Sequence, residues 1–212
     1  MEGKIFPVGM DEEERVIAFL NKNFVPDEPL NRSQGVTKGF QSPLDMLTSD
    51  MCLKMESETG DLMGLVLNVV ENDLPQDKVK SENEDGESAC PASHDPEFIP
   101  VLRFLNHVDS LVPIKDKEGI MHIHIVAVDG SWRNQGIGRR LVEASVKLAR
   151  DRGVPGVQVN CSNHYTSRMV EKIPEFRKIL SVPYDSYLDP CGEPVFRIPP
   201  PHDAMHVYHM SL

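Results

Sequence analysis

The clearest hydrophobic pattern in the chain is a strand-like stretch that passes into a helix-like one. Residues 123–128 form a nearly continuous run of Ile, Val and Ala between polar and glycine positions, which favours a buried strand. Beyond a short loop, apolar residues recur at helical spacing, at Ile137, Leu141, Val142, Leu148 and Ala149. We expect this helix to run to Arg152 and to stop at Gly153, a residue type that suits helix C-termini.

Similar patterns predict elements on both sides of this unit. They are a strand at Lys4–Val8, a helix from about 11 to 24, strands at 51–56 and 62–70 that form a hairpin, a helix at 98–112, a strand at 157–161, a helix at 163–172, and tail strands at 182–184, 193–198 and 205–210. The first helix begins with a capping box of Asp11 and Glu14 and ends before Pro26. In the helix at 98–112, the expected core positions are Ile99, Leu102, Leu105, Val108 and Leu111.

Strand, helix and strand between 121 and 161 predict a right-handed parallel unit, and hence an α/β fold. In open α/β sheets, ligands bind outside the carboxyl ends of the strands. Those ends are Val128-Asp129 and Cys161-Ser162. We therefore expect the functional site there.

The loop before the helix at 137 has the features of an anion site. The first N–H groups of a helix have no internal partner and lie at the positive end of its dipole, which suits a pyrophosphate. Gly136 and Gly138 allow a ligand close to the backbone, and Arg133, Arg139 and Arg140 add positive charge to a chain of net charge −11. The sequence has neither the Gly-x-Gly-x-x-Gly dinucleotide fingerprint nor the Gly-Lys-Ser/Thr of a P-loop. A surface turn with a helix cap is the alternative reading.

Composition limits the classes of protein to which this chain can belong. A length of 212 residues is consistent with one domain over 1–212, and no apolar stretch has the length of a membrane span. The acidic balance argues against nucleic acid as a partner, and the absence of a signal-peptide core leads us to expect a cytoplasmic protein. The four scattered cysteines indicate neither a disulfide framework nor a zinc knot. The stretch from Gln76 to Pro96 is acidic with few apolar residues, which predicts a mobile loop.

Two histidines are candidate metal ligands. His122 and His124 alternate along a predicted strand and so share a face. Zinc needs further ligands, and the sequence offers no third one at a useful interval. We predict no metal site.

Adjacent carboxylates, Asp27 and Glu28, lie between Pro26 and Pro29, where neither caps a convincing helix. A carboxylate whose pKa is raised by burial can act as a general base. An exposed acidic turn is the simpler reading of these residues alone.

The spacing Arg133-x-x-Gly136-x-Gly138 after an apolar strand resembles the acetyl-CoA signature of the GNAT superfamily of N-acetyltransferases. The resemblance implies a mixed, twisted central sheet flanked by helices, and acetyl-CoA as cosubstrate. It implies that backbone groups of Val126 and Val128 hold the pantetheine arm, with help from Asn163. The pyrophosphate would then lie on the loop of Arg133, Asn134, Gln135, Gly136, Ile137 and Gly138.

Two segments more narrowly resemble insect arylalkylamine N-acetyltransferases. Phe24-Val25-Pro26-Asp27-Glu28-Pro29-Leu30-Asn31 is similar to their Asp-Glu-Pro-Leu segment, which makes Glu28 the catalytic base. Cys161-Ser162-x-His164-Tyr165-x-x-Arg168 is similar to a segment with catalytic serines, which correspond to Ser162 and Thr166. The resemblance also implies that Asp27, Pro29 and His202 lie near the amine.

The chain departs from the family pattern in two places. The tyrosine with which many GNAT enzymes protonate the leaving thiolate corresponds to Val170, and the usual Leu-Gly-Phe is replaced by Ile173-Pro174-Glu175-Phe176. Another donor, or water, must therefore protonate the thiolate. We expect an arylalkylamine N-acetyltransferase that acts by direct transfer in a ternary complex. The alternatives are an N-acetyltransferase for an aliphatic amine such as agmatine or a polyamine, and a non-catalytic acetyl-CoA-binding module.

Overall fold

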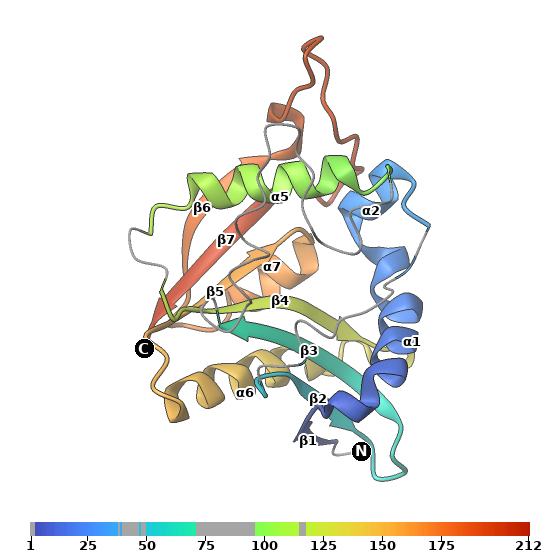
Figure 1. Cartoon of the computed structure of the whole chain (residues 1–212), viewed down its shortest axis with the longest axis vertical. Coiled ribbons are helices and arrows are strands. Elements are labelled where there is room, and N and C mark those ends of the chain that lie inside the picture. The colour runs from blue at the N-terminus through green and yellow to red at the C-terminus, as the bar shows by residue number, and fades with distance from the viewer. Residues whose placement is uncertain (1–2, 38, 40–46, 48–49, 71–95, 115–117) are drawn as a thin grey trace.

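The computed structural model describes residues 3–37, 39, 47, 50–70, 96–114 and 118–212. Its centre is a seven-stranded sheet with the strand order β1-β2-β3-β4-β5-β7-β6 (Figure 1). The sheet is mixed, because β4 and β5 are parallel while all other neighbours are antiparallel. The α/β fold class with a mixed sheet flanked by helices is thus confirmed.

The strands are β1 (Lys4–Pro7), β2 (Leu53–Glu56), β3 (Leu62–Val70), β4 (Met121–Val128), β5 (Gly156–Cys161), β6 (Arg177–Pro183) and β7 (Ala204–Ser211). The α-helices are α1 (Glu13–Asn23), α2 (Pro29–Gln34), α5 (Ile99–Leu111), α6 (Ile137–Asp151) and α7 (His164–Val170). Short 3-10 turns are η1 (Met10–Glu12), η2 (Val25–Asp27), η5 (Gly130–Trp132) and η6 (Tyr184–Ser186). None of the described helices is both long and apolar enough to cross a membrane.

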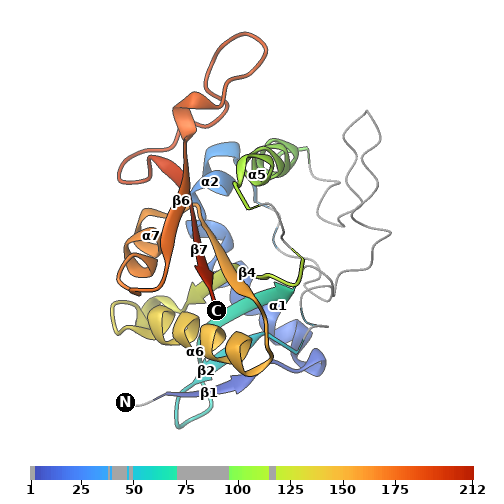
Figure 2. The same cartoon turned by 90° about the vertical axis from the view of Figure 1, so that its left-hand side faces the viewer.

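Helices cover both faces of the sheet (Figure 2). Helices α6 and α7 lie on one face, where α6 packs on β3 and β4 and α7 on β5 and β7. Helices α1, α2 and α5 lie on the other face, where α1 contacts β4 and α2 contacts α5. The central unit, β4 to β5 through α6, has the parallel geometry expected from the sequence.

Strands β4 and β5 are hydrogen-bonded at one end only. Their ladder joins Met121–Ile123 to Val157–Val159 and goes no further along either strand. At the next residue, His124, β4 has an extra residue relative to β3, because Leu67 pairs with Ile125 while Asn68 pairs with Ile123. A bulge of this kind bends a strand and changes which side chains face which side. The carboxyl ends of β4 and β5 therefore separate, and backbone groups face the gap between them.

Several sequence expectations are confirmed, namely the hairpin of β2 and β3, helix α6 with its end before Gly153, strand β5, and the helix that follows β5, α7. Others were wrong. The first helical turn is capped by Glu12, whose carboxylate accepts a hydrogen bond from the Gly9 N–H at 3.1 Å, so Asp11 and Glu14 do not form the box.

Two further expectations fail for reasons of packing. Residues 193–198 form no strand, because only an isolated bridge joins Leu188 to Pro194. Of the expected core positions in α5, Val108 is buried, Ile99, Leu102 and Leu105 are half-buried, and Leu111 is exposed. The buried face is Val101, Phe104 and Val108, because the helix turns toward β6 and β7. The acidic stretch from Gln76 lies outside the described residues apart from Pro96.

Candidate active site

Glu28 lies at the junction of η2 and α2 and is the N-cap of α2. Its Oε2 accepts a hydrogen bond from the Asn31 N–H at 2.6 Å, and Pro29 occupies the first helical position, where a missing N–H costs nothing. The expectation that neither carboxylate caps a helix was therefore wrong. No hydrophobic pattern predicts α2, because its six residues are too few for a helical period to show.

Burial sets the chemistry of Glu28. The residue is only 7% exposed, and its Oε1 is buried without a hydrogen-bond partner among the described residues. Burial raises the pKa of Glu28, and the Asn31 N–H, the Ser162 hydroxyl and the Leu30 N–H oppose this without cancelling it. A carboxylate with a raised pKa and a free oxygen is suited to take a proton from a bound ligand.

The end of β5 and the end of β6 meet at Glu28. The Ser162 hydroxyl stabilises the Glu28 carboxylate, and the Ser162 carbonyl accepts a hydrogen bond from the Tyr184 hydroxyl at 2.6 Å. Burial first, and the Glu28 charge second, raise the pKa of Tyr184. Sequence reasoning missed Tyr184 as a site residue, because nothing in the local spacing around 182–184 links it to Glu28.

Three of the predicted site residues lie in the first turn of α7 or contact it. Asn163 caps the helix through its side-chain oxygen, which accepts from the Tyr165 N–H at 2.8 Å, and its amide nitrogen remains able to donate. Thr166 is half-buried in the same helix. His202 reaches this turn from the β6–β7 loop, where its Nδ1 accepts from the His164 N–H at 3.1 Å. Burial lowers the pKa of His202, which favours the neutral imidazole that this acceptor role requires.

The loop that precedes α6 has the geometry expected of an anion site. Asn134 and Gly136 both have positive φ, 63° and 76°, and no side chain caps the helix, so its first N–H groups face outward. A Cβ on Gly138 would lie 3.1 Å from the Met169 sulfur, 3.6 Å from Val126 and 3.7 Å from Val128. The absence of a side chain there brings the start of α6 against β4 and α7.

Arg133 is directed toward α1 and η2. Its guanidinium lies 2.7 Å from the Asp27 carboxylate and donates to the carbonyl oxygens of Asn23 and Val128 at 3.1 and 3.2 Å. Asp27 is thereby paired with Arg133, and both side chains are about half exposed. The structure thus joins the loop expected for acetyl-CoA to the segment that carries Glu28.

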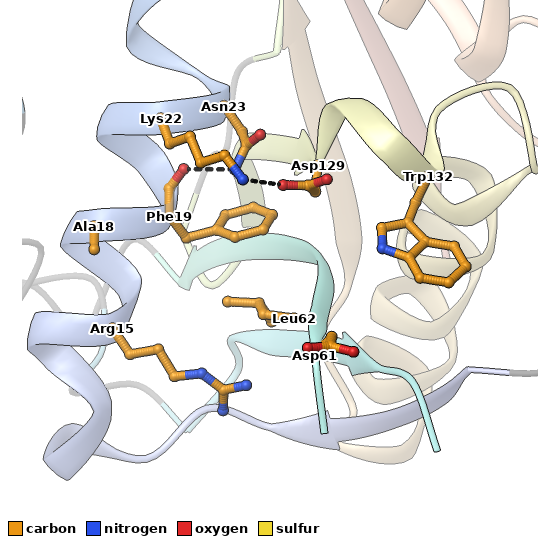
Figure 3. A pocket seen from close by; sticks show the side chains of 9 residues that line it. All are labelled: Arg15, Ala18, Phe19, Lys22, Asn23, Asp61, Leu62, Asp129 and Trp132. Carbon is orange, nitrogen blue, oxygen red and sulfur yellow. Dashed lines mark hydrogen bonds and ion pairs between the residues drawn. The ribbon is translucent and has the colours of Figure 1, made fainter. Parts of the chain in front are cut away.

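Two more contacts tie α1 to this loop. Lys22 Nζ lies 2.8 Å from the Asp129 carboxylate, and the Asn23 side-chain oxygen accepts from the Gly130 N–H at 3.3 Å. Lys22 and Asp129 line an open depression of about 400 Å³, and Figure 3 shows the contact between their side chains. It is lined by Arg15, Ala18, Phe19, Lys22, Asn23, Asp61, Leu62, Asp129 and Trp132. Glu28 is not among them, so this depression is separate from the candidate site.

No group of three or more His, Cys, Asp or Glu side chains in the described part of the chain is arranged to hold a metal ion. The rings of His122 and His124 do lie close together, with centroids 5.8 Å apart.

Known proteins resemble this chain in sequence and in fold. Residues 58–173 match the model of the acetyltransferase (GNAT) family. This range covers β3 to α7, including the loop before α6 and the start of α7, but it begins after Glu28.

Solved structures share the fold over the whole chain. Arylalkylamine N-acetyltransferase 2 from Aedes aegypti is 24% identical, with a TM-score of 0.84, and the match covers 100% of this chain and 99% of that one. The Drosophila melanogaster polyamine N-acetyltransferase, which forms N-acetylagmatine, is 22% identical with a TM-score of 0.80 and full coverage of both chains. A mosquito arylalkylamine N-acetyltransferase-like protein, 5b, is 18% identical with a TM-score of 0.80, again with full coverage of both.

Proposed function

The chain belongs to the acetyltransferase (GNAT) family, and on that basis we propose that it transfers the acetyl group of acetyl-CoA to a primary arylalkylamine of the dopamine, serotonin, tyramine or octopamine type. The sequence prediction of an N-acetyltransferase is confirmed at the level of the family. The proposal adds the amine, the residues that act on it, and direct transfer in a ternary complex within one domain spanning 1–212.

The observation that carries the proposal is the buried Glu28. A primary amine is protonated at neutral pH, and only the neutral amine can attack a thioester. Glu28 removes this proton, directly or through water, because its Oε1 has no hydrogen-bond partner among the described residues and its pKa is raised by burial. Ser162 and Thr166 lie at the carboxyl end of β5 and on α7, where their hydroxyls are suited to orient the amine and to pass protons.

Acetyl-CoA supplies the acetyl group as an activated thioester. The uncapped start of α6, with Gly136, Ile137 and Gly138, is suited to its pyrophosphate. Backbone groups of Val126 and Val128, on the part of β4 that does not pair with β5, can bond the pantetheine amides, and the Asn163 amide nitrogen can add a donor. Backbone N–H groups at this gap can also stabilise the negative oxygen that develops during transfer.

Aromatic side chains near Glu28 support an aryl substrate over an aliphatic one. Phe104 lies with its ring centroid 5.0 Å from those of Tyr187 and Phe196 and 5.7 Å from that of Tyr184. Leu30, two residues after Glu28, belongs to the same apolar cluster. A diamine or agmatine would call for a second carboxylate, and among the described residues none of the groups that shift the pKa of Glu28 is a carboxylate. Asp27, the nearest in sequence, is paired with Arg133.

The test is release of CoA from acetyl-CoA by the purified protein, measured with arylalkylamines, polyamines, agmatine and lysine peptides, with Glu28→Gln as the matched control. Turnover confined to arylalkylamines supports the proposal. Turnover confined to agmatine or polyamines would establish the aliphatic alternative. Acetyl-CoA binding without turnover on any amine would identify a binding module instead.

A further inference from the structure

On the sheet face covered by α1, α2 and α5, a row of polar side chains separates two apolar clusters. One cluster joins α1 to β3 and β4 and includes Leu65, Ile125 and Ala127. The other joins α2 and α5 to β6 and β7 and includes Leu30, Met205 and Val207. Between them, the residues of β4 and β5 that face this side are His122, His124, Gln158 and Asn160.

The strand register fixes these positions. Val157 and Val159 of β5 belong to the cluster on the α6 face, so Gln158 and Asn160 face the opposite way. Gln158 pairs with His122 of β4 on one side and with His209 of β7 on the other. We call Gln158 and Asn160, with His122 beside them, the β5 polar row.

The side chain of Gln158 is buried but only partly hydrogen-bonded. It is 0% exposed, and its Nε2 donates to the Asn160 side-chain oxygen at 3.0 Å. Its Oε1 is buried without a hydrogen-bond partner among the described residues. A buried polar atom left unpaired is costly and occurs where a ligand or an ordered water completes the site.

The β5 polar row leads toward Glu28. Alternation along an extended strand places Ser162 on the same side as Asn160, about 7 Å further along. The Ser162 hydroxyl is one of the groups that stabilise the Glu28 carboxylate. The hydrogen bond from Gln158 holds its amide beside Asn160, on the side of β5 that leads to Ser162.

We propose that Gln158 and Asn160 form the far end of the amine site and select arylalkylamines that carry a hydroxyl group on the ring. This inference rests on the proposed function. A phenolic hydroxyl both donates and accepts a hydrogen bond, so it can bond the free oxygen of Gln158 while accepting from a neighbouring donor. The β5 polar row contains no acidic side chain, and His122 is its only titratable residue, which suits a neutral hydroxyl better than a second cationic group.

The experiment compares kcat/KM for tyramine and phenethylamine, which differ only in the ring hydroxyl, in wild type, Gln158→Met and Asn160→Val. Methionine retains the length and flexibility of glutamine without its hydrogen bonds. We expect wild type to prefer tyramine by about tenfold or more, the equivalent of one buried hydrogen bond. Both variants should reduce this ratio toward one, chiefly through the loss of activity on tyramine.

The ratio cancels losses of active protein that affect both amines equally, so partial misfolding does not imitate the expected result. An unchanged ratio in both variants would overturn the inference, and would mean that the β5 polar row holds water only. An equal loss on both amines would also overturn it, in favour of a role in supporting Glu28. Absence of turnover on either amine in wild type, with turnover on an aliphatic amine, would refute the proposed function itself.

Discussion

On the sheet face covered by α6 and α7 the buried side chains form one apolar cluster, whereas on the opposite face they form two clusters with polar side chains between them. The first face holds the start of α6 in place against β3 and β4. The second contains the buried carboxylate of Glu28 and the buried amide of Gln158. Buried polar groups cost stability unless they are fully paired. Polar groups buried on the first face, such as the Ser145 and Ser167 hydroxyls, are hydrogen-bonded, whereas Oε1 of Glu28 and Oε1 of Gln158 have no partner among the described residues. We infer from these unpaired oxygens that the second face carries the chemistry and that the first face supports it.

Replacing the proposed base, Glu28, should have the largest effect. Glu28→Gln is expected to lower turnover by roughly 100- to 10,000-fold, the usual contribution of a general base. The affinity for acetyl-CoA should stay the same, because Glu28 lies on the opposite face from α6. Steady-state kinetics and calorimetric titration with acetyl-CoA measure the two quantities. Loss of cofactor binding together with turnover would contradict the assignment.

The pH dependence of activity provides a second test of Glu28 as the base. Its pKa is raised by burial, and the base must be ionised to act, so activity should rise with pH along a limb that lies above the ordinary carboxylate range. This limb should disappear from the residual activity of Glu28→Gln. A limb that persists in the variant would assign it to the amine or to another group.

A cavity in the face covered by α6 and α7, which we call the supporting face, should reduce stability without changing the reaction. Leu141 of α6 is fully buried in the large cluster, so Leu141→Ala is expected to lower the free energy of unfolding by about 2–5 kcal/mol. Denaturant titration measures this loss. At a temperature where the variant is folded, the pH limb of Glu28 should be unchanged, and a displaced limb would show that the two faces are coupled.

Gly136→Val tests the loop that begins α6. Valine at a φ of 76° introduces strain of about 1–2 kcal/mol, and its side chain would enter the space, empty of protein atoms within 4 Å, through which a ligand approaches the backbone. Affinity for acetyl-CoA should fall by about tenfold or more, with turnover at saturation less affected.

Gly153→Val is the matched control for this strain. Gly153 has a φ of 70° with equally open surroundings, and it lies at the other end of α6. The control should lose similar stability and retain its affinity for acetyl-CoA. Equal losses of affinity in both variants, or none in Gly136→Val, would remove the pyrophosphate from this loop.

Tyr208→Phe should have the smallest effect. The Tyr208 hydroxyl donates to Glu171 at 2.9 Å and accepts from the buried Ser167 hydroxyl at 2.6 Å, which fixes α7 on β7. Its loss should reduce stability by about 0.5–1.5 kcal/mol. The tyramine to phenethylamine ratio should not change, because Tyr208 lies on the supporting face. A changed ratio would show that α7 transmits its position to the amine site.

Local signals predicted the supporting face well. The apolar run of β4, the helical spacing of α6 and Gly153 act over short distances, so their patterns survive in the sequence. The chemical face was harder to predict. Glu28 obtains its environment from the cap of a six-residue helix, from Ser162 and from Tyr184, which are brought together only by the fold. The strand expected at 193–198 failed for a related reason, because Phe196 is buried by aromatic packing with Phe104 rather than by strand pairing.

The bulge at His124 has a consequence for how this chain can evolve. Deleting one residue there would restore a regular ladder between β3 and β4 and would exchange the sides on which Ile125 to Val128 lie. Val126 would then turn away from α6 and Ala127 toward it, which would disturb both clusters at once. Homologues should therefore tolerate insertions and deletions in the turn at 57–61 far more readily than inside β4. The length of this one strand should be more strictly preserved than its composition.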